Sequence, residues 1–156
     1  SIKQMVLLLG PQKIISWLGL FLYGVPQNRP FGTEIFNNAK FRAKVMEELA
    51  LMCNKPELAN KAFLTGSLSL IDAYLNIPML EFLNNVHLDD EIKTALLFRE
   101  GFLGELLYIA TEMNHSEDTE ATIKKLGHYP CFSTEQLYDA CTKATIFVEE
   151  TESHPN

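Results

Sequence analysis

Residues 62–76 read AFLTGSLSLIDAYLN, a run of helix length that decides how the rest of the chain is interpreted. On a helical projection its apolar side chains fall on every side, with few polar breaks between them. A helix that is apolar all round is buried, so we expect this one to lie in the core. The run contains one carboxylate, Asp72, and no histidine. We therefore expect a core helix without a reaction centre.

Apolar residues recur at helical spacing on both sides of this run, and no segment alternates at period two for long enough to indicate a strand. Capping patterns and glycine or proline breaks mark the helix ends. The sequence predicts an all-α fold of about eight helices. These cover residues before 10, 11–24, 33–50, 54–76, 79–85, 89–101, 103–112, 116–126 and a final stretch from 133.

The composition is that of a folded domain, because 47% of the 156 residues are hydrophobic and 21% are charged. We expect one helical domain over residues 1–150 and a polar tail over 151–156. The chain starts at Ser1 and enters a helical pattern at once. We therefore also expect it to be a fragment that lacks the N-terminal helices of its domain.

Charge and cysteine content exclude several classes of protein. The net charge is −7 and there is no dense basic stripe, so nucleic acid is not an expected partner. The three cysteines show no CxxC spacing, which argues against a disulfide scaffold or a structural zinc site. The N-terminal apolar run is too short to span a bilayer. We expect a cytoplasmic protein without a membrane segment or a cofactor.

Catalytic patterns are weak. A helical metal phosphohydrolase needs His and Asp side chains that converge on one ion, and commonly uses an adjacent His-Asp pair, which this sequence lacks. The cluster from His87 to Asp90 has the side chains to hold a cation, but acids at a helix start are more often structural. No nucleophile elbow or phosphate loop is present. The sequence therefore predicts no catalytic residue and no metal ligand.

Asp72 is the residue that most needs a partner, because a lone carboxylate in a core costs several kcal/mol or becomes neutral. Arg42 is the best candidate, since it lies among apolar positions of the 33–50 helix. Helices that pack through Ala43 and Ala73 would bring the two together as a buried bidentate ion pair. The alternative role for Asp72 is a metal ligand or a general base.

A set of segments, in this order and spacing, resembles the HDOD domain in the form found C-terminal to EAL domains of bacterial signalling proteins. The resemblance runs from residue 1 to about 112. The segments are VLLLG (6–10), FRAK (41–44), ELA (48–50), AFLTG (62–66), SLIDA (69–73) and IPM (77–79).

This resemblance has an implication for chemistry. The HDOD domain is similar in fold to the HD and HD-GYP phosphohydrolases, whose Gly-Leu-Leu-His-Asp-Ile-Gly segment falls on residues 66–72. Ser69 and Leu70 then occupy the positions of the metal-binding His-Asp pair. Leucine cannot bind a metal and serine is a poor ligand, so the resemblance implies an HD-like helical bundle that lacks the metal-binding pair.

These observations together predict a non-catalytic regulatory or interaction domain of a bacterial signal-transduction protein. The resemblance implies a link to cyclic di-GMP through an upstream EAL domain. Its partner would be another protein, the adjacent EAL-type domain or a second copy of itself. Two alternatives stay open: a residual metal-dependent phosphohydrolase, and a small-molecule sensor whose ligand site would be lined by Trp17, Tyr23, Phe41 and Tyr74.

Overall fold

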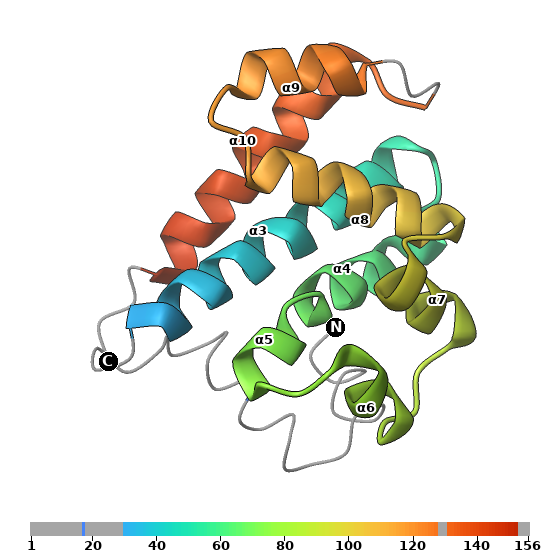
Figure 1. Cartoon of the computed structure of the whole chain (residues 1–156). Helices are drawn as coiled ribbons and strands as arrows, with labels where there is room; N and C mark the ends of the chain where they lie inside the picture. Colours follow the sequence, from blue (N-terminus) through green and yellow to red (C-terminus); the bar gives the residue numbers. More distant parts are fainter. Residues whose placement is uncertain (1–16, 18–29, 128–130, 153–156) are drawn as a thin grey trace.

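The computed structural model describes residue 17 and residues 30–127 and 131–152, which form an all-α fold (Figure 1). The predicted fold class and the prediction of about eight helices are confirmed. The two helices predicted before residue 24 lie outside the described residues, apart from Trp17. The elements are α3 (Pro30–Met52), the 3-10 helix η1 (Pro56–Leu58), α4 (Ala59–Leu68), α5 (Ile71–Leu75), α6 (Met79–Asn84), α7 (Asp90–Phe98), α8 (Gly101–Asn114), α9 (Thr119–Leu126) and α10 (Thr134–Glu152).

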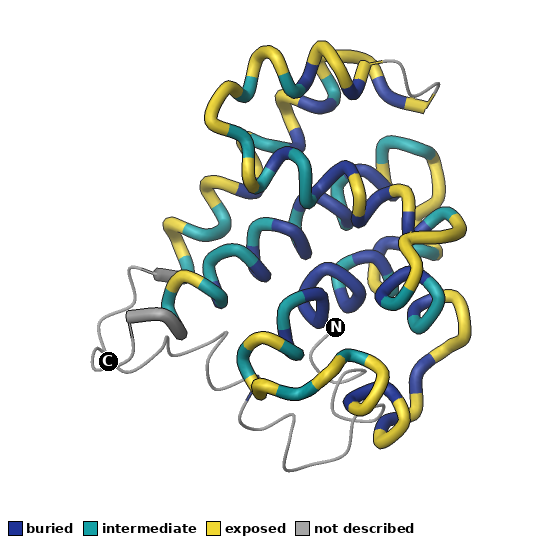
Figure 2. The backbone as a smooth tube through the Cα atoms, in the orientation of Figure 1, coloured by how far each residue is buried: buried dark blue, intermediate teal, exposed yellow. Residues whose placement is uncertain are grey.

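Helix α3 lies at the centre of the described fold, because it packs against α4, α10 and α8 (Figure 1). Figure 2 shows long buried stretches on α3, α4 and α8. The apolar residues that recur at helical spacing along this helix form a buried stripe, since each is at most 1% exposed: Phe36, Ala39, Ala43, Met46 and Ala50. Burial of this stripe supplies the hydrophobic free energy that holds the three neighbouring helices.

The 62–76 run is not one buried helix, and that prediction is wrong in its second half. Helix α4 ends at Leu68, and a separate short helix, α5, starts at Ile71. At the break, the Ser69 hydroxyl donates a hydrogen bond to the Gly66 carbonyl at 2.7 Å. Leu70 has φ −123° and ψ 10°, outside the helical range. Side-chain bonds of this kind compete with the helical ladder, and α5 consequently turns toward the surface, where Ala73 is exposed.

Glycine allows α3 and α4 to approach closely. A Cβ atom at Gly66 would lie 2.5 Å from the Ala43 Cα and 2.6 Å from the Ala43 nitrogen. No real Cβ atom tolerates such distances, so only glycine fits at this crossing. The close approach sets Ser69, three residues later in the chain, beside the polar residues of α3.

Helix α10 begins with a side-chain cap. Ser133 and Gln136 form a reciprocal capping box at the start of α10, with distances of 3.0 Å and 3.1 Å.

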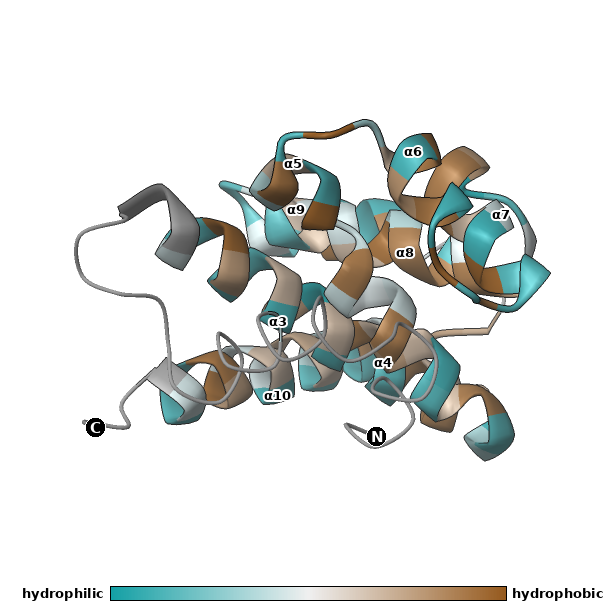
Figure 3. Ribbon diagram, turned by 90° about the horizontal axis from the view of Figure 1, so that it is seen from below, coloured by the Kyte–Doolittle hydropathy of each residue, from teal (hydrophilic) through white to brown (hydrophobic). Residues whose placement is uncertain are grey.

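Helices α5 and α6 carry both hydrophobic and hydrophilic residues (Figure 3), and Leu75 and Leu80 on these helices are exposed. Among the described residues, no helix has the length and apolar character needed to cross a membrane.

Candidate functional site

A buried arginine connects three parts of the fold. Arg42, on α3, is 3% exposed. Its Nε donates to Asn114 Oδ1 at 3.0 Å, its Nη1 donates to Ser69 Oγ at 3.4 Å, and its Nη2 lies 2.6 Å from His115 Nε2. A guanidinium can only donate, so the His115 Nε2 atom is the acceptor of this hydrogen bond. We call Arg42, Ser69, Asn114 and His115 the arginine centre.

Burial disfavours the charged form of Arg42 in the arginine centre. Burial, followed by repulsion from Arg99, lowers the pKa of Arg42 to about 10, and attraction to Asp72 opposes this. Burial likewise lowers the pKa of Arg99, again opposed by Asp72. Two guanidinium groups therefore share the attraction of one carboxylate, and the guanidinium of Arg42 remains charged at neutral pH.

The guanidinium of Arg99 is held at the end of α7 by backbone carbonyls of that helix. It adopts a left-handed conformation with φ 57°, and its Nη1 donates to the carbonyls of Ala95 at 3.3 Å and Leu96 at 3.0 Å. A cation at a helix C-terminus is favourable because the last carbonyls carry partial negative charge. Arg99 therefore stays at a fixed place near the arginine centre.

The sequence-predicted residues come together only in part. Within the described residues the ion pairs closer than 4.0 Å do not include Arg42 with Asp72, and the attraction between these two charges acts over a longer distance. Ser69 is buried and contacts Arg42, while Leu70 is half-buried against the core. Sequence reasoning missed Asn114 as a partner of the arginine.

Asn114 is itself held in place, because its Nδ2 donates to Asn38 Oδ1 on α3 at 3.0 Å. The amide therefore bridges two side chains of α3 from the last turn of α8. The only signal for this in the sequence is the pair Asn114-His115 at the end of an apolar helix, which offers acceptors to a buried donor.

The residues at the Ser69 position do not fit a metal ion. The Ser69 hydroxyl already donates to Gly66 and accepts from Arg42. A fixed positive charge beside it opposes the approach of a divalent cation. Within the described part of the chain, no three His, Cys, Asp or Glu side chains lie close enough together to hold a metal.

The acids at the start of α7 have a structural partner. Lys61 Nζ, on α4, lies 2.9 Å from Asp89 Oδ2 and 2.5 Å from Glu91 Oε1. These contacts tie the start of α7 to α4. Asp89, one of the acids in the His87–Asp90 cluster, is thus paired with a lysine of α4.

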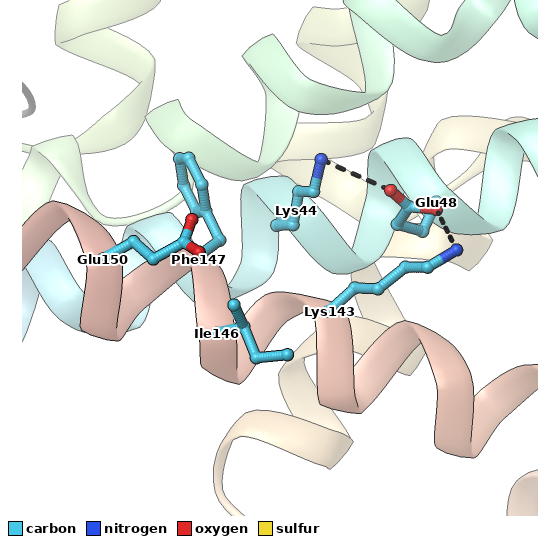
Figure 4. A pocket seen from close by; sticks show the side chains of 6 residues that line it. All are labelled: Lys44, Glu48, Lys143, Ile146, Phe147 and Glu150. Carbon is cyan, nitrogen blue, oxygen red and sulfur yellow. Dashed lines mark hydrogen bonds and ion pairs between the residues drawn. The ribbon is translucent and has the colours of Figure 1, made fainter.

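A second candidate surface is a shallow groove of about 240 Å³ between α3 and α10 (Figure 4). Glu48 lies in its wall and pairs with Lys44 at 3.3 Å and Lys143 at 3.5 Å. Ile146 is 46% exposed at its edge. The remaining lining residues are Phe147 and Glu150. Paired charges around an exposed apolar side chain are typical of a protein contact rather than of a small-molecule site.

Two of the four aromatic residues considered for a sensor site, Trp17 and Tyr74, pack against each other and against Phe36. The ring centroid of Trp17 lies 4.6 Å from that of Phe36 and 5.8 Å from that of Tyr74. Phe36 and Tyr74 meet edge to face at 5.4 Å. Such contacts are those of a filled core. Phe41 is half-buried, and Tyr23 lies outside the described residues.

Comparison with known proteins gives two distant relatives. The chain is 30% identical over 108 residues to the cyclic di-GMP phosphodiesterase CdgJ of Vibrio cholerae, a match that covers 69% of this chain and 24% of that enzyme. It is 32% identical over 99 residues to the uncharacterized protein YuxH of Bacillus subtilis, covering 62% of this chain and 24% of that protein. The chain thus spans about a quarter of the length of each. No family model and no solved structure matches.

Proposed function

We propose that this chain is a non-catalytic regulatory domain of a bacterial signal-transduction protein, and that it controls cyclic di-GMP turnover by contact with an EAL-type domain. The similarity to part of a cyclic di-GMP phosphodiesterase supports the link to this signal. The observation that supports the proposal is the arginine centre, in which a guanidinium contacts Ser69, the residue that the resemblance aligns with a metal-binding histidine.

The arginine centre suits a domain that transmits a change of helix position. Arg42 bonds to the end of α4 through Ser69 and to the end of α8 through Asn114 and His115. Breaking hydrogen bonds to a buried charge is costly, so these helix ends are expected to move together with α3. A contact made on α3 is thereby coupled to the opposite side of the fold.

The α3–α10 groove is the surface that we assign to the partner. It lies between α10 and α3, the helix that also carries Arg42, and Ile146 is exposed among its lining residues. The partner is the neighbouring EAL-type domain, and a second copy of this domain is the competing occupant. An exposed apolar side chain beside charge pairs becomes buried when a partner binds, and such a residue is a common centre of a protein contact.

The test has a catalytic arm and a regulatory arm. The purified chain, incubated with cyclic di-GMP and Mn²⁺ or Mg²⁺, is expected to leave the nucleotide intact. In the full-length protein, Ile146→Asp is expected to change the rate of cyclic di-GMP hydrolysis. Thr145→Asp is the matched control, because it adds the same charge at an exposed neighbour outside the groove.

Two results would contradict the proposal. If the chain alone hydrolyses cyclic di-GMP and a chelator stops this activity, the chain is a metal-dependent phosphohydrolase. Equal hydrolysis rates for Ile146→Asp, Thr145→Asp and the unchanged protein would remove the groove as the regulatory contact. Analytical ultracentrifugation of both variants separates loss of a second copy from loss of the neighbouring domain.

A further inference from the structure

The α3–α10 groove combines apolar surface with charges that differ from one end to the other. Figure 4 shows Glu48 between two lysines at one end of the groove. Ile146, Phe147 and Glu150 line the groove from α10, toward the end of that helix. A partner in this groove therefore meets an apolar centre and, beyond it, an acid.

The apolar centre of the groove is held in a fixed position. The ring of Phe147 meets that of Phe63, on α4, edge to face at 6.0 Å between centroids, and Lys44 Nζ lies 5.8 Å from the centre of the Phe147 ring. These contacts hold the ring from two sides. Ile146, the preceding residue, is 46% exposed beside this fixed ring. A partner can therefore bury Ile146 without rearranging the groove.

The charges around the groove are mainly negative. Two lysines of the groove face three carboxylates at 3.0–3.5 Å, in the pairs Lys44 with Glu47 and Glu48, and Lys143 with Glu48 and Asp139. Glu149 and Glu150 add two more carboxylates toward the end of α10, and both are exposed. The sequence has no lysine or arginine after Lys143. A partner thus meets more negative than positive charge.

The acids of α10 lie where a helix tolerates negative charge least. The helix ends at Glu152, and the last carbonyls of a helix carry partial negative charge. The last turn of α10 contains no basic residue. Carboxylates and carbonyls repel one another there, and a cation that a partner brings reduces the repulsion. The end of α10 therefore favours a cationic contact.

We propose that the groove takes an amphipathic helix of the partner domain that carries an apolar residue and, one turn away, a lysine or arginine. The apolar side chain packs on Ile146 and Phe147, and the cation reaches Glu150. Ile146 and Glu150 are one helical turn of about 5.4 Å apart, so a helix aligned along α10 presents its two residues three or four positions apart. The inference rests on the proposed function, because it names the chemistry of the partner at the same surface.

Other occupants meet obstacles in this groove. Its volume of about 240 Å³ is below the roughly 300–1,000 Å³ that is usual for small-molecule pockets. A phosphate-bearing ligand would meet carboxylates. A second copy would bring two acidic helix ends together, because a closed dimer uses the same surface of both copies. A domain that presents a basic helix meets none of these obstacles.

Charge reversal in the full-length protein tests the inference. Glu150→Lys and Glu149→Lys should each shift the rate of cyclic di-GMP hydrolysis in the same direction as Ile146→Asp, by about two- to fivefold, the effect of losing one exposed ion pair. The shift should shrink in about 0.5 M NaCl, because salt screens exposed charges. Glu135→Lys is the matched control, since it makes the same change of charge at an exposed position in the first turn of α10. This control should leave the rate unchanged.

The outcomes separate the inference from the proposed function. If both charge reversals behave like Glu135→Lys while Ile146→Asp still alters the rate, the cationic partner is wrong and the proposed function stands. If Ile146→Asp also leaves the rate unchanged, both are wrong. Dimers of the full-length protein that Ile146→Asp dissociates would assign the groove to a second copy and overturn the inference. Circular dichroism checks folding, and Glu149→Lys carries the comparison if Glu150→Lys does not fold.

Discussion

The close crossing of α3 and α4 gives the sharpest prediction about the fold, which concerns the substitution Gly66→Ala. The added Cβ would lie 2.5 Å, 2.6 Å and 2.8 Å from the Ala43 Cα, the Ala43 nitrogen and the Arg42 carbonyl carbon. All three are backbone atoms, so no rotamer change can relieve the overlap. The helices must separate, and Ser69 then moves away from Arg42.

The size of the effect is the difference between two opposing terms. Alanine in a helix interior is favoured over glycine by about 1 kcal/mol. Overpacking typically costs about 1–3 kcal/mol, and the upper end applies because backbone must move. The expected net loss is about 2 kcal/mol in the free energy of unfolding. In a chain of this length that corresponds to a fall of about 4–8 °C in melting temperature.

Thermal unfolding followed by circular dichroism at 222 nm checks this prediction. Gly127→Ala is the matched control, because Gly127 has φ −63° and its added Cβ would meet no atom closer than 3.4 Å. The control should be unchanged or slightly more stable. A Gly66→Ala melting temperature equal to or above that of the unchanged chain would refute the argument that glycine sets the helix spacing.

Three further predictions concern buried and half-buried ionisable groups. Arg42→Met should alter the free energy of unfolding in urea by less than about 1 kcal/mol, because it keeps the volume and removes a desolvated charge. Arg42→Ala should lower that free energy by about 3 kcal/mol, because it leaves a cavity. Equal losses for the two variants would contradict this prediction. Asp72→Asn should lower stability by about 0.5–1 kcal/mol through its lost attraction to the guanidinium groups, and that loss should shrink in 1 M NaCl. The raised pKa of Cys53, about 11, makes the folded state bind more protons than the unfolded state between about pH 9 and 11. Stability should therefore fall as the pH rises through that range, and fall less in Cys53→Ser, as measured by urea unfolding at each pH.

Much of the fold follows from periodicity and capping. The buried stripe of α3 repeats at the helical period, and the start of α10 carries a capping box in its sequence. The break after α4 does not follow from the pattern, because it depends on the Ser69 hydroxyl bonding back to the Gly66 carbonyl. Leu70 and Ile71 continue the apolar run across the break, and hydrophobic pattern alone cannot detect a change in backbone direction.

The arginine centre was only half predictable. Arg42 lies in an apolar stretch of α3, and this position marks it as a buried charge that needs acceptors. The choice between Asp72 and other acceptors depends on tertiary packing, since Asn114 and His115 lie 72 and 73 residues further along the chain. The turn of α5 toward the surface leaves Asp72 half-buried, so other side chains contact the guanidinium and the carboxylate acts at longer range.

Ser69 accounts both for the loss of metal chemistry that we propose and for the polar contacts that remain in the core. A serine at position 69 offers one hydroxyl, which accepts from Arg42 and donates to the α4 backbone. A histidine there would need more room and would present a second ring nitrogen to the guanidinium. Burying Arg42 opposes stability, as its lowered pKa indicates. If Arg42→Met leaves stability nearly unchanged but alters the control of cyclic di-GMP hydrolysis in the full-length protein, the role of Arg42 is in regulation. A large loss of stability in the same variant would make Arg42 a structural residue.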